Sequence, residues 1–185
     1  GFLGKHVVAA FRRIECDVRE INRTIFGNTQ MLDDALKGVQ AVIHLAGINR
    51  ASDEELEHGN IALATKLTEA LDRIGISPSI LYSSSIQEKR DVPYGRGKRK
   101  AGDVLLAWAE KHEAKAIRVI IPNVFGAGSR PNYNSVVATF CQKLANKETP
   151  EIIQDNEIDL IHVDDVAASF VDLVQNENPK GGNTV

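Results

Sequence analysis

The sequence predicts an α/β fold in which helices cover both faces of a mostly parallel, doubly wound sheet. Segments whose apolar residues recur at helical spacing alternate along the chain with short, nearly unbroken apolar runs. Strands separated by helices in this way form parallel βαβ units. Polar, turn-rich segments follow two of the runs, at residues 85–93 and 126–134. Because ligands bind at the carboxyl edge of such a sheet, both loops are expected beside a ligand.

Each expected element follows from local spacing and from the turn residues at its ends. Strands are expected at residues 16–21, 39–45, 79–84, 116–121 and 160–163. Helices are expected at residues 5–14, 31–36, 53–74, 94–112, 134–146 and 164–174. Gly38 is the expected C-cap of the second helix, Gly75 follows the third, and Asp164 is the expected N-cap of the last.

The composition excludes several classes of protein. The 185 residues carry 22 Lys and Arg against 25 Asp and Glu, a net charge of −3, so nucleic acid and anionic membranes are not expected partners. No apolar run approaches the roughly 20 residues of a membrane helix. Two cysteines make no disulfide framework, which favours a reducing cytoplasm. The chain opens on a glycine-rich turn, so the natural protein is expected to start earlier.

Three short motifs are compatible with a dinucleotide. Gly1 and Gly4 open a helix, as glycines do where a backbone approaches a pyrophosphate at a helix N-terminus. The segment 45–47 (Leu-Ala-Gly) ends a buried strand with small residues that leave room for a flat ligand. Arg23 follows the expected strand at residues 16–21, a place where an acid would favour NAD and an arginine the 2′-phosphate of NADP. A frayed turn, an ordinary loop glycine and a solvated arginine are the alternatives.

The most specific pattern joins a serine strand end to a tyrosine and a lysine. Ser83, Ser84 and Ser85 end a buried strand, and Tyr94 and Lys98 lie four residues apart at the start of a helix. A lysine beside a phenol favours the phenolate and lowers the phenol pKa, which suits general acid–base catalysis near neutral pH. A serine hydroxyl can bond to the same carbonyl oxygen.

Together these motifs resemble the extended short-chain dehydrogenase/reductases of the nucleotide-sugar epimerase/dehydratase type, whose fold is Rossmann-like. The residues that carry the resemblance occur in family order: Gly1 to Gly4, His44 to Gly47, Asn60, Ser83 to Ser85, Tyr94 with Lys98, Pro122 to Gly126, and His162 to Val166. Residues 45–50, 83–87 and 130–141 further resemble the reductase domain of the CapF family of capsular polysaccharide enzymes.

The resemblance implies that residues 1–185 form an NAD(P)-binding domain that lacks its first strand and most of its C-terminal substrate-binding part. The implied activity is that of an NADPH-dependent ketoreductase. It would act on the 4-keto group of a UDP-linked 6-deoxy amino sugar in capsular or surface polysaccharide synthesis. NADP is the implied cofactor, with NAD as the alternative, and the helices at 53–74 and 94–112 imply a homodimer.

Roles for individual residues also follow from the resemblance. Tyr94 would donate a proton to the C4 carbonyl oxygen, Lys98 would lower the Tyr94 pKa and hold the nicotinamide ribose, and Ser85 would bond to the carbonyl, with Ser84 as the alternative. The implied cofactor contacts are Gly1, Phe2, Leu3, Gly4, Arg23, Leu45, Ala46, Gly47, Tyr94, Lys98 and Pro122. The implied substrate contacts are Ser84, Ser85, Asn49, Arg50, Asn123 and Arg130.

Other functions stay open to different degrees. A 4-epimerase uses the same Ser, Tyr and Lys and is the main enzymatic alternative. A 4,6-dehydratase needs an acid and a base beside its catalytic hydroxyl. The family places Asp-Glu directly after that hydroxyl, and here Ile86 and Gln87 stand there. A non-catalytic NAD(P)-sensing protein would not need both Tyr94 and Lys98. The five histidines lack metal-ligand spacing, so no metal is expected. Gly97 departs from the family, which usually has Ser before the lysine.

Overall fold

The computed structural model describes residues 1–152 and 154–175, which fall into two compact units. The first unit comprises residues 1–17 and 121–172. The second comprises residues 18–120 together with the described residues from 173 onward. In the part of the chain that the structure describes, no helix is both long and apolar enough to cross a membrane.

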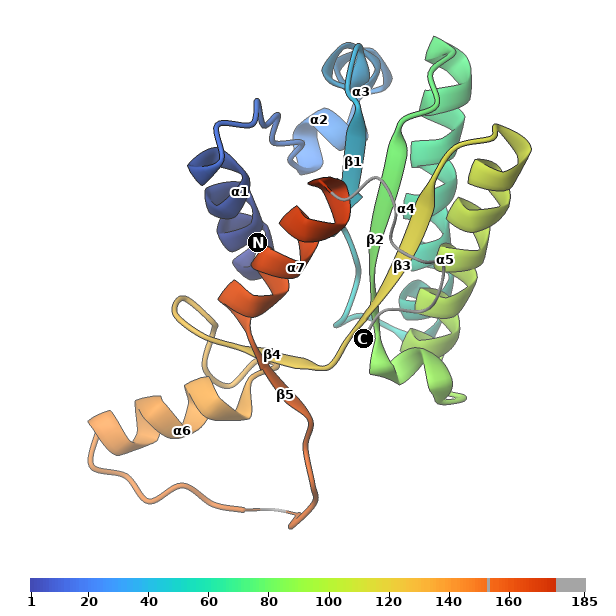
Figure 1. Cartoon of the computed structure of the whole chain (residues 1–185). Coiled ribbons are helices and arrows are strands. Elements are labelled where there is room, and N and C mark those ends of the chain that lie inside the picture. The colour runs from blue at the N-terminus through green and yellow to red at the C-terminus, as the bar shows by residue number, and fades with distance from the viewer. Residues whose placement is uncertain (153, 176–185) are drawn as a thin grey trace. The chain divides into compact units, whose positions relative to one another are not determined.

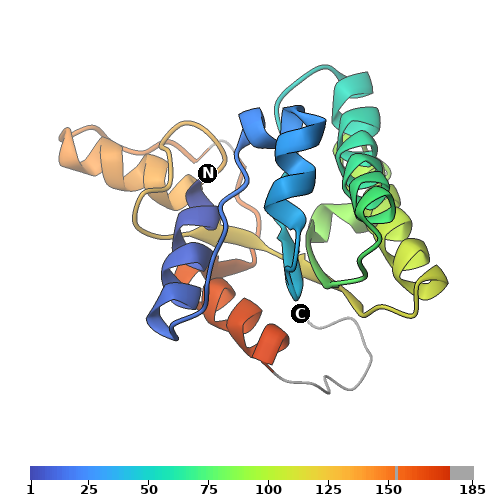
Figure 2. The same ribbon diagram turned by 90° about the horizontal axis from the view of Figure 1, so that it is seen from above.

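The second unit is built around a three-stranded sheet in the order β1-β2-β3. The strands are β1 (Ala41–His44), β2 (Ser79–Ser85) and β3 (Ala116–Ile121), and β1 runs parallel to β2. Helix α4 (Asp53–Ile74) connects β1 to β2, and α5 (Pro93–Lys111) connects β2 to β3. The two helices lie side by side along the sheet (Figures 1 and 2). Mixed α/β architecture with parallel strands flanked by helices is thereby confirmed.

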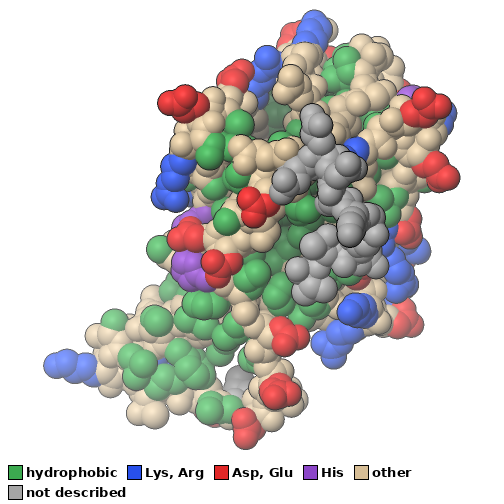
Figure 3. Space-filling view, in the orientation of Figure 1, with side chains coloured by type: hydrophobic (Ala, Val, Ile, Leu, Met, Phe, Trp, Pro, Cys, Tyr) green, Lys and Arg blue, Asp and Glu red, His purple; other side chains and the backbone are tan. Residues whose placement is uncertain are grey.

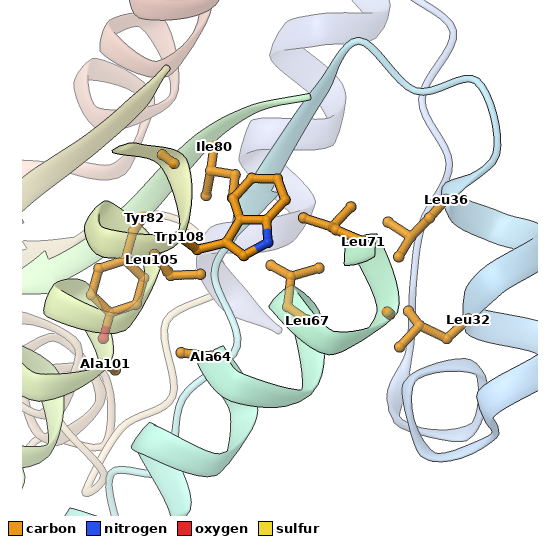
Figure 4. Packing of buried hydrophobic residues seen from close by; sticks show 12 residues of the cluster. Leu32, Leu36, Ala64, Leu67, Leu71, Ile80, Tyr82, Ala101, Leu105 and Trp108 are labelled. Atoms are coloured by element: carbon orange, nitrogen blue, oxygen red, sulfur yellow. The ribbon is translucent and has the colours of Figure 1, made fainter. Parts of the chain in front are cut away.

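The core of this unit is an apolar cluster shared by α3 (Thr29–Leu36), α4, β2 and α5 (Figure 4). Leu71 of α4 and Ile80 of β2 are fully buried in it, and Trp108 of α5 is 6 % exposed. The Trp108 indole N–H donates to a carboxylate oxygen of Asp72 at 2.6 Å, which satisfies the buried ring's one polar group. This packing fixes α5 against the sheet, and α5 carries the predicted catalytic pair.

Helix α4 begins and ends where its sequence signals predict. Ser52 caps the helix by accepting from the Glu55 N–H, and the Glu55 carboxylate accepts in return from the Ser52 N–H, which makes a capping box. At the other end Gly75 has φ 67°, the left-handed conformation that suits glycine. The predicted helix over residues 53–74 is confirmed at both ends.

The first unit contains α1 (Phe2–Arg13), β4 (Asn123–Phe125), α6 (Val136–Ala145), β5 (Leu160–His162) and most of α7 (Val163–Gln175). β4 and β5 pair in parallel. The two His6 ring nitrogens lie 2.7 Å from an Asp164 carboxylate oxygen and 2.9 Å from the Ala127 carbonyl oxygen, which ties α1 to α7. No residue of α6 is buried, and Figure 3 shows apolar side chains on its surface.

The structure corrects several expected elements. The expected strand at residues 16–21 is wrong, because these residues have no regular structure and no described strand pairs with them. Alternating polarity alone cannot make a strand, which needs a hydrogen-bonding neighbour. The short helix α2 (Arg23–Gly27) and strand β4 were not expected. Asp164 lies inside the first turn of α7 instead of at its N-cap, and Lys37, not Gly38, is the C-cap of α3.

Candidate active site

Strand β2 and helix α5 bring the predicted catalytic residues into one region of the second unit. β2 ends at Ser85, the 3₁₀ helix η1 (Ile86–Lys89) follows, and α5 begins at Pro93. Proline suits the first position of a helix because no intrahelical bond needs its missing N–H. Tyr94 and Lys98 therefore lie in the first two turns of α5, and the start of the helix at Pro93 sets their backbone positions.

Two glycines let the start of α5 approach its neighbours closely. A Cβ on Gly95 would lie 2.2 Å from the Gln87 carbonyl oxygen of η1. A Cβ on Gly97 would lie 2.5 Å from the Leu56 carbonyl oxygen of α4. Both distances are far below ordinary van der Waals contact. The departure at Gly97 therefore has a physical reason in this chain, because the α4 backbone occupies the space that a serine side chain would need.

Lys98 is a buried cation, 4 % exposed, whose ammonium lies 4.4 Å from the centre of the Tyr82 ring. Burial lowers the pKa of Lys98 to about 8, and the negative charge of Glu88 opposes that shift. The ring face offers a weak cation–π contact, and no hydrogen-bond acceptor for the ammonium occurs among the residues that the structure describes. The site thus holds a desolvated positive charge ready for a polar ligand.

His44, at the end of β1, stacks on the same Tyr82 ring with centroids 5.7 Å apart. Burial, and secondly the Lys98 charge, lowers the pKa of His44 to about 3, so the imidazole is neutral at physiological pH. Its Nε2 is buried and has no hydrogen-bond partner within the described part of the chain. The Tyr82 ring therefore contacts both the neutral His44 imidazole and the Lys98 ammonium.

The Tyr94 phenol differs from the prediction made from its spacing to Lys98. Burial raises the pKa of Tyr94, so the expected lowering is not found. The reason is desolvation of the phenolate, which penalises the charged form. Tyr94 is therefore a protonated group at neutral pH, in the state needed to donate a proton.

The three serines at the end of β2 have different partners. Ser83 Oγ donates to the His44 carbonyl oxygen at 3.4 Å. Ser84 Oγ donates to the Glu88 carboxylate. Ser85 Oγ instead accepts from the Gln87 N–H at 3.2 Å, as the cap of η1, and no acceptor for its own hydrogen occurs among the described residues. Ser85 can therefore offer a hydroxyl proton to a ligand, whereas the Ser84 proton is committed.

Asn60 of α4 shapes the loop that follows β1. Its side chain donates to the Ile48 carbonyl oxygen at 2.9 Å and accepts from the Ile48 N–H at 3.1 Å. Gly47, in this loop, is exposed, and a Cβ there would lie 3.2 Å from Asn60 Oδ1 and 3.5 Å from Lys98 Nζ. The glycine thus keeps open the space beside the ammonium. Lys98, with Gly47 and Asn60 beside it, is thus a residue that could hold a hydroxyl group of a dinucleotide.

The remaining predicted contacts occupy the following places. Leu45, Ala46, Asn49 and Arg50 lie in the same loop after β1, and Arg23 is the exposed first residue of α2. In the first unit, Gly1 is the N-cap of α1, followed by Phe2, Leu3 and Gly4 in its first turn. Pro122 separates β3 from β4. Asn123 donates to the Asp159 carbonyl oxygen at 3.2 Å, and the Arg130 guanidinium lies 5.4 Å from the Tyr133 ring centre.

Three further residues contact these side chains or one another and were not predicted from the sequence: Tyr82, Glu88 and Arg118. Glu88 is 8 % exposed, although its polar loop suggested solvent. The one sequence signal for the contact between Ser84 and Glu88 was their separation by four residues. That separation predicts neighbouring side chains only within a helix. Arg118 lies on β3 with its guanidinium 3.7 Å from the Glu88 carboxylate.

Parallel strands flanked by helices are typical of nucleotide-binding proteins, and comparison with known sequences identifies the family. The family described as "NAD dependent epimerase/dehydratase family" matches residues 1–185. The chain belongs to that family.

Two individual relatives are more than 30 % identical to the chain. The chain is 35 % identical over 177 residues to UDP-2-acetamido-2,6-beta-L-arabino-hexul-4-ose reductase of Pseudomonas aeruginosa, which covers 94 % of this chain and 47 % of the relative. It is 31 % identical to the capsular polysaccharide assembling protein CapF of Staphylococcus aureus, with a TM-score of 0.79 over 99 % of this chain and 48 % of that one. The chain therefore spans about half the length of these relatives.

A third neighbour shares the fold alone. The UDP-N-acetylglucosamine 4-epimerase of Bacillus cereus is 22 % identical, with a TM-score of 0.82 over 98 % of this chain and 71 % of that one.

Proposed function

We propose that the protein is an NADPH-dependent ketoreductase that reduces the C4 ketone of a UDP-linked 2-acetamido-2,6-dideoxy sugar. One arrangement supports the proposal: Tyr94 and the buried Lys98 lie in the first turns of α5, and this helix packs against β2, which ends at Ser85 with its hydroxyl proton available. The 35 % identity to a reductase whose name specifies a 4-ketose sugar supports this substrate class.

Side chains of the protein supply the proton for the C4 oxygen of the substrate and orient that oxygen. The Tyr94 phenol donates its proton to the C4 oxygen, and the Ser85 hydroxyl bonds to that oxygen and orients the ketone. The buried Lys98 ammonium stabilises the phenolate that remains and binds the ribose hydroxyls. Bound NADPH supplies the hydride that reaches C4. Gly47 and Asn60 keep the space beside Lys98 open.

The roles of the remaining predicted contacts follow from the family resemblance. The N-terminus of α1, from Gly1 to Gly4, binds the pyrophosphate, and Pro122 contacts the nicotinamide. Arg23 favours the 2′-phosphate of NADP, with NAD as the alternative. Asn49, Arg50, Asn123 and Arg130 contact the sugar nucleotide. The protein acts in the cytoplasm as a homodimer in capsular or surface polysaccharide synthesis.

A dehydratase needs further acid and base groups beside the sugar, which a ketoreductase does not need. Elimination of water needs an acid and a base that are available to the sugar. Glu88 is the buried carboxylate of this cluster, but one of its oxygens accepts from Ser84 and the other faces Arg118. This arrangement favours reduction. A 4-epimerase uses the same Ser, Tyr and Lys and is the remaining alternative.

The test is incubation of the full-length protein with the UDP-4-keto sugar and NADPH. We expect loss of the reduced-nicotinamide absorbance in a 1:1 ratio to the alcohol formed. In a parallel assay with the UDP-sugar that carries a hydroxyl at C4, interconversion of its two C4 epimers without net NADPH consumption would identify an epimerase instead. Cofactor binding without any turnover would identify a non-catalytic sensor and contradict the proposal.

A matched pair of variants assigns the proton donor. Tyr94→Phe should lower kcat by about 10² to 10⁴-fold, the usual contribution of a positioned acid, while leaving NADPH affinity nearly unchanged. Tyr82→Phe removes only a hydroxyl that donates to the Lys98 carbonyl oxygen at 3.2 Å, so it should retain far more activity. Equal losses in both variants would refute the assignment of Tyr94.

A further inference from the structure

A buried network of polar groups holds the 3₁₀ helix η1, which follows Ser85, against three neighbouring elements. Ser84 at the end of β2 donates to the Glu88 carboxylate. The Arg118 guanidinium of β3 lies 3.7 Å from the other carboxylate oxygen, and both side chains are largely buried. The Arg99 guanidinium of α5 donates to the Glu88 carbonyl oxygen at 2.9 Å. Glu88 is therefore the residue through which β2, β3 and α5 hold η1.

The cation of this network, Arg118, is itself held from α5. A second guanidinium nitrogen of Arg118 donates to the Asp103 carboxylate. A Cβ on Gly102 would lie 2.4 Å from Arg118 Nε, so any larger residue would displace the guanidinium. Because burying a charge is costly unless it is paired, the buried Glu88 carboxylate is expected to stay beside this cation.

The backbone of Gln87, the residue before Glu88, joins this network to the candidate active site. Its N–H donates to Ser85 Oγ at 3.2 Å, and its carbonyl oxygen lies 2.2 Å from the place of a Cβ on Gly95. Gln87 is thus next to Ser85 and also next to the turn of α5 that carries Tyr94. Since the Ser85 oxygen accepts from Gln87, the Ser85 proton is directed elsewhere. The place of Gln87 therefore sets the orientation of this hydroxyl.

We propose that Glu88 is a positioning residue, which fixes η1 so that the Gln87 N–H keeps the Ser85 hydroxyl oriented as a donor toward the substrate ketone. Contacts from the side chains of Ser84, Arg99 and Arg118 hold Glu88 in place. A 3₁₀ helix of four residues has few hydrogen bonds of its own, so it depends on such outside contacts. The catalytic meaning of this inference rests on the proposed function.

The first test is a double-mutant cycle between Glu88 and Ser85, measured as kcat with the UDP-4-keto sugar and NADPH. Glu88→Ala should lower kcat about 10-fold, because even a small displacement of a catalytic group is costly. In the Ser85→Ala background the same substitution should change kcat by less than about 2-fold, because the hydroxyl that it displaces is already absent. An equal loss in both backgrounds, which general loosening would produce, or no loss with Ser85 present, would overturn the proposal.

Two further variants of η1 serve as controls for the kinetics. Glu88→Gln keeps an acceptor for Ser84 and loses the charge that pairs with Arg118, so it should lose less kcat than Glu88→Ala. Lys89→Ala removes the exposed neighbouring side chain and should leave kcat unchanged. A loss in Lys89→Ala equal to that in Glu88→Ala would show that η1 is sensitive to any substitution, and the assignment of Glu88 would fail.

Amide hydrogen exchange tests the same inference without turnover. The Gln87 N–H donates to Ser85, so its exchange rate, followed by NMR, should rise about 10-fold or more in Glu88→Ala and stay unchanged in Lys89→Ala. An unchanged rate in Glu88→Ala would refute the positioning role. If the unaltered protein fails to reduce the keto sugar, the proposed function fails, while these exchange rates still decide whether Glu88 holds Gln87.

Arg99→Met covers the case in which Glu88→Ala does not fold. It leaves the buried carboxylate and Arg118 in place and removes only the donor to the Glu88 carbonyl oxygen. Exchange of the Gln87 N–H should again be faster, and kcat should fall with Ser85 present but not in Ser85→Ala. Arg99→Met with the exchange rate and kcat of the unaltered protein would contradict the proposal.

Discussion

Gly95 gives the sharpest test of how the candidate site is assembled. A Cβ at this position would lie 2.2 Å from the Gln87 carbonyl oxygen and 2.6 Å from the Arg90 carbonyl oxygen, whereas ordinary contact begins at 3.4 Å. Both neighbours are backbone atoms, which cannot move aside by a rotamer change. In Gly95→Ala the segment after β2 must therefore retreat from α5 by about 1 Å.

Two effects of opposite sign set the stability of this variant. Alanine in a helix interior gains up to about 1 kcal/mol over glycine, and overpacking of a tight contact costs about 1 to 3 kcal/mol or more. Because the contact is among the closest in the chain, we expect a net loss of about 1 to 2 kcal/mol. For a domain of this size, that loss lowers Tm by roughly 2 to 8 °C.

Activity should be more sensitive than stability. The displaced segment contains Glu88 and follows directly on Ser85, while Tyr94 and Lys98 stay on the helix, so the retreat pulls Ser85 away from the helix pair. A displacement of about 1 Å at a catalytic constellation costs on the order of 10²-fold in rate. The assay is NADPH consumption with the UDP-4-keto sugar, run at a temperature well below the variant's Tm.

Gly27→Ala is the matched control, because Gly27 ends a helix and a Cβ there would meet nothing within 4 Å. It should be neutral or slightly stabilising and fully active. Gly95→Ala with the stability and turnover of the unaltered protein would refute the argument from close packing.

Three further predictions follow from the side-chain partners. Ser85→Ala should lower kcat by about 10² to 10³-fold, whereas Ser84→Ala should chiefly destabilise, by about 1 to 3 kcal/mol, because it leaves the Glu88 carboxylate without its donor; the reverse result in kinetic and denaturation assays would exchange the two roles. Lys98→Met should be more stable than the unaltered protein at pH 7, by about 3 kcal/mol at most, since burial lowers the folded-state pKa of Lys98 from 10.5 to about 8. The unfolded chain binds more protons between those two values, so the advantage should shrink as pH rises from about 8 to 10.5 in denaturant titrations, and a constant difference would contradict this. Hydrogen bonds from Lys100 and Arg96 lower the pKa of Glu57 from 4.5 to about 2. The stabilising contribution of Glu57 should therefore be complete above pH 4.5 and disappear between pH 4.5 and 2. In thermal unfolding, Glu57→Gln should show a smaller loss of Tm over that acid range than the unaltered protein.

Local signals explain what the sequence could predict of the fold. The helix over residues 53–74 is bounded by a capping box at Ser52 and a left-handed glycine at Gly75, and both signals act within a few residues. The expected strand at residues 16–21 failed because a strand depends on a distant neighbour, which its own alternation does not report. Strand β4 is short, three residues, and exists through its pairing with β5.

The candidate site divides in the same way. The four-residue spacing of Tyr94 and Lys98 placed both on the first turns of one helix, and the structure agrees. The direction of the Tyr94 pKa shift could not be predicted, because desolvation depends on how the surrounding elements pack. Glu88 was missed for the same reason, since its burial and its pairing with Arg118 join segments 30 residues apart in the printed sequence.

Lys98 shows why the Tyr-x-x-x-Lys spacing is only part of the site. The spacing brings a cation onto the tyrosine's face of the helix, but burial alone would drive that cation toward its neutral form. Two features outside the motif act against this: the Tyr82 ring face and the Glu88 carboxylate. A helix with the same spacing on a solvent-exposed face would keep its lysine charged without them, and it would lack the desolvation that makes an electrostatic contact strong. The chemistry therefore depends on the β2 and η1 residues as much as on the helix pair.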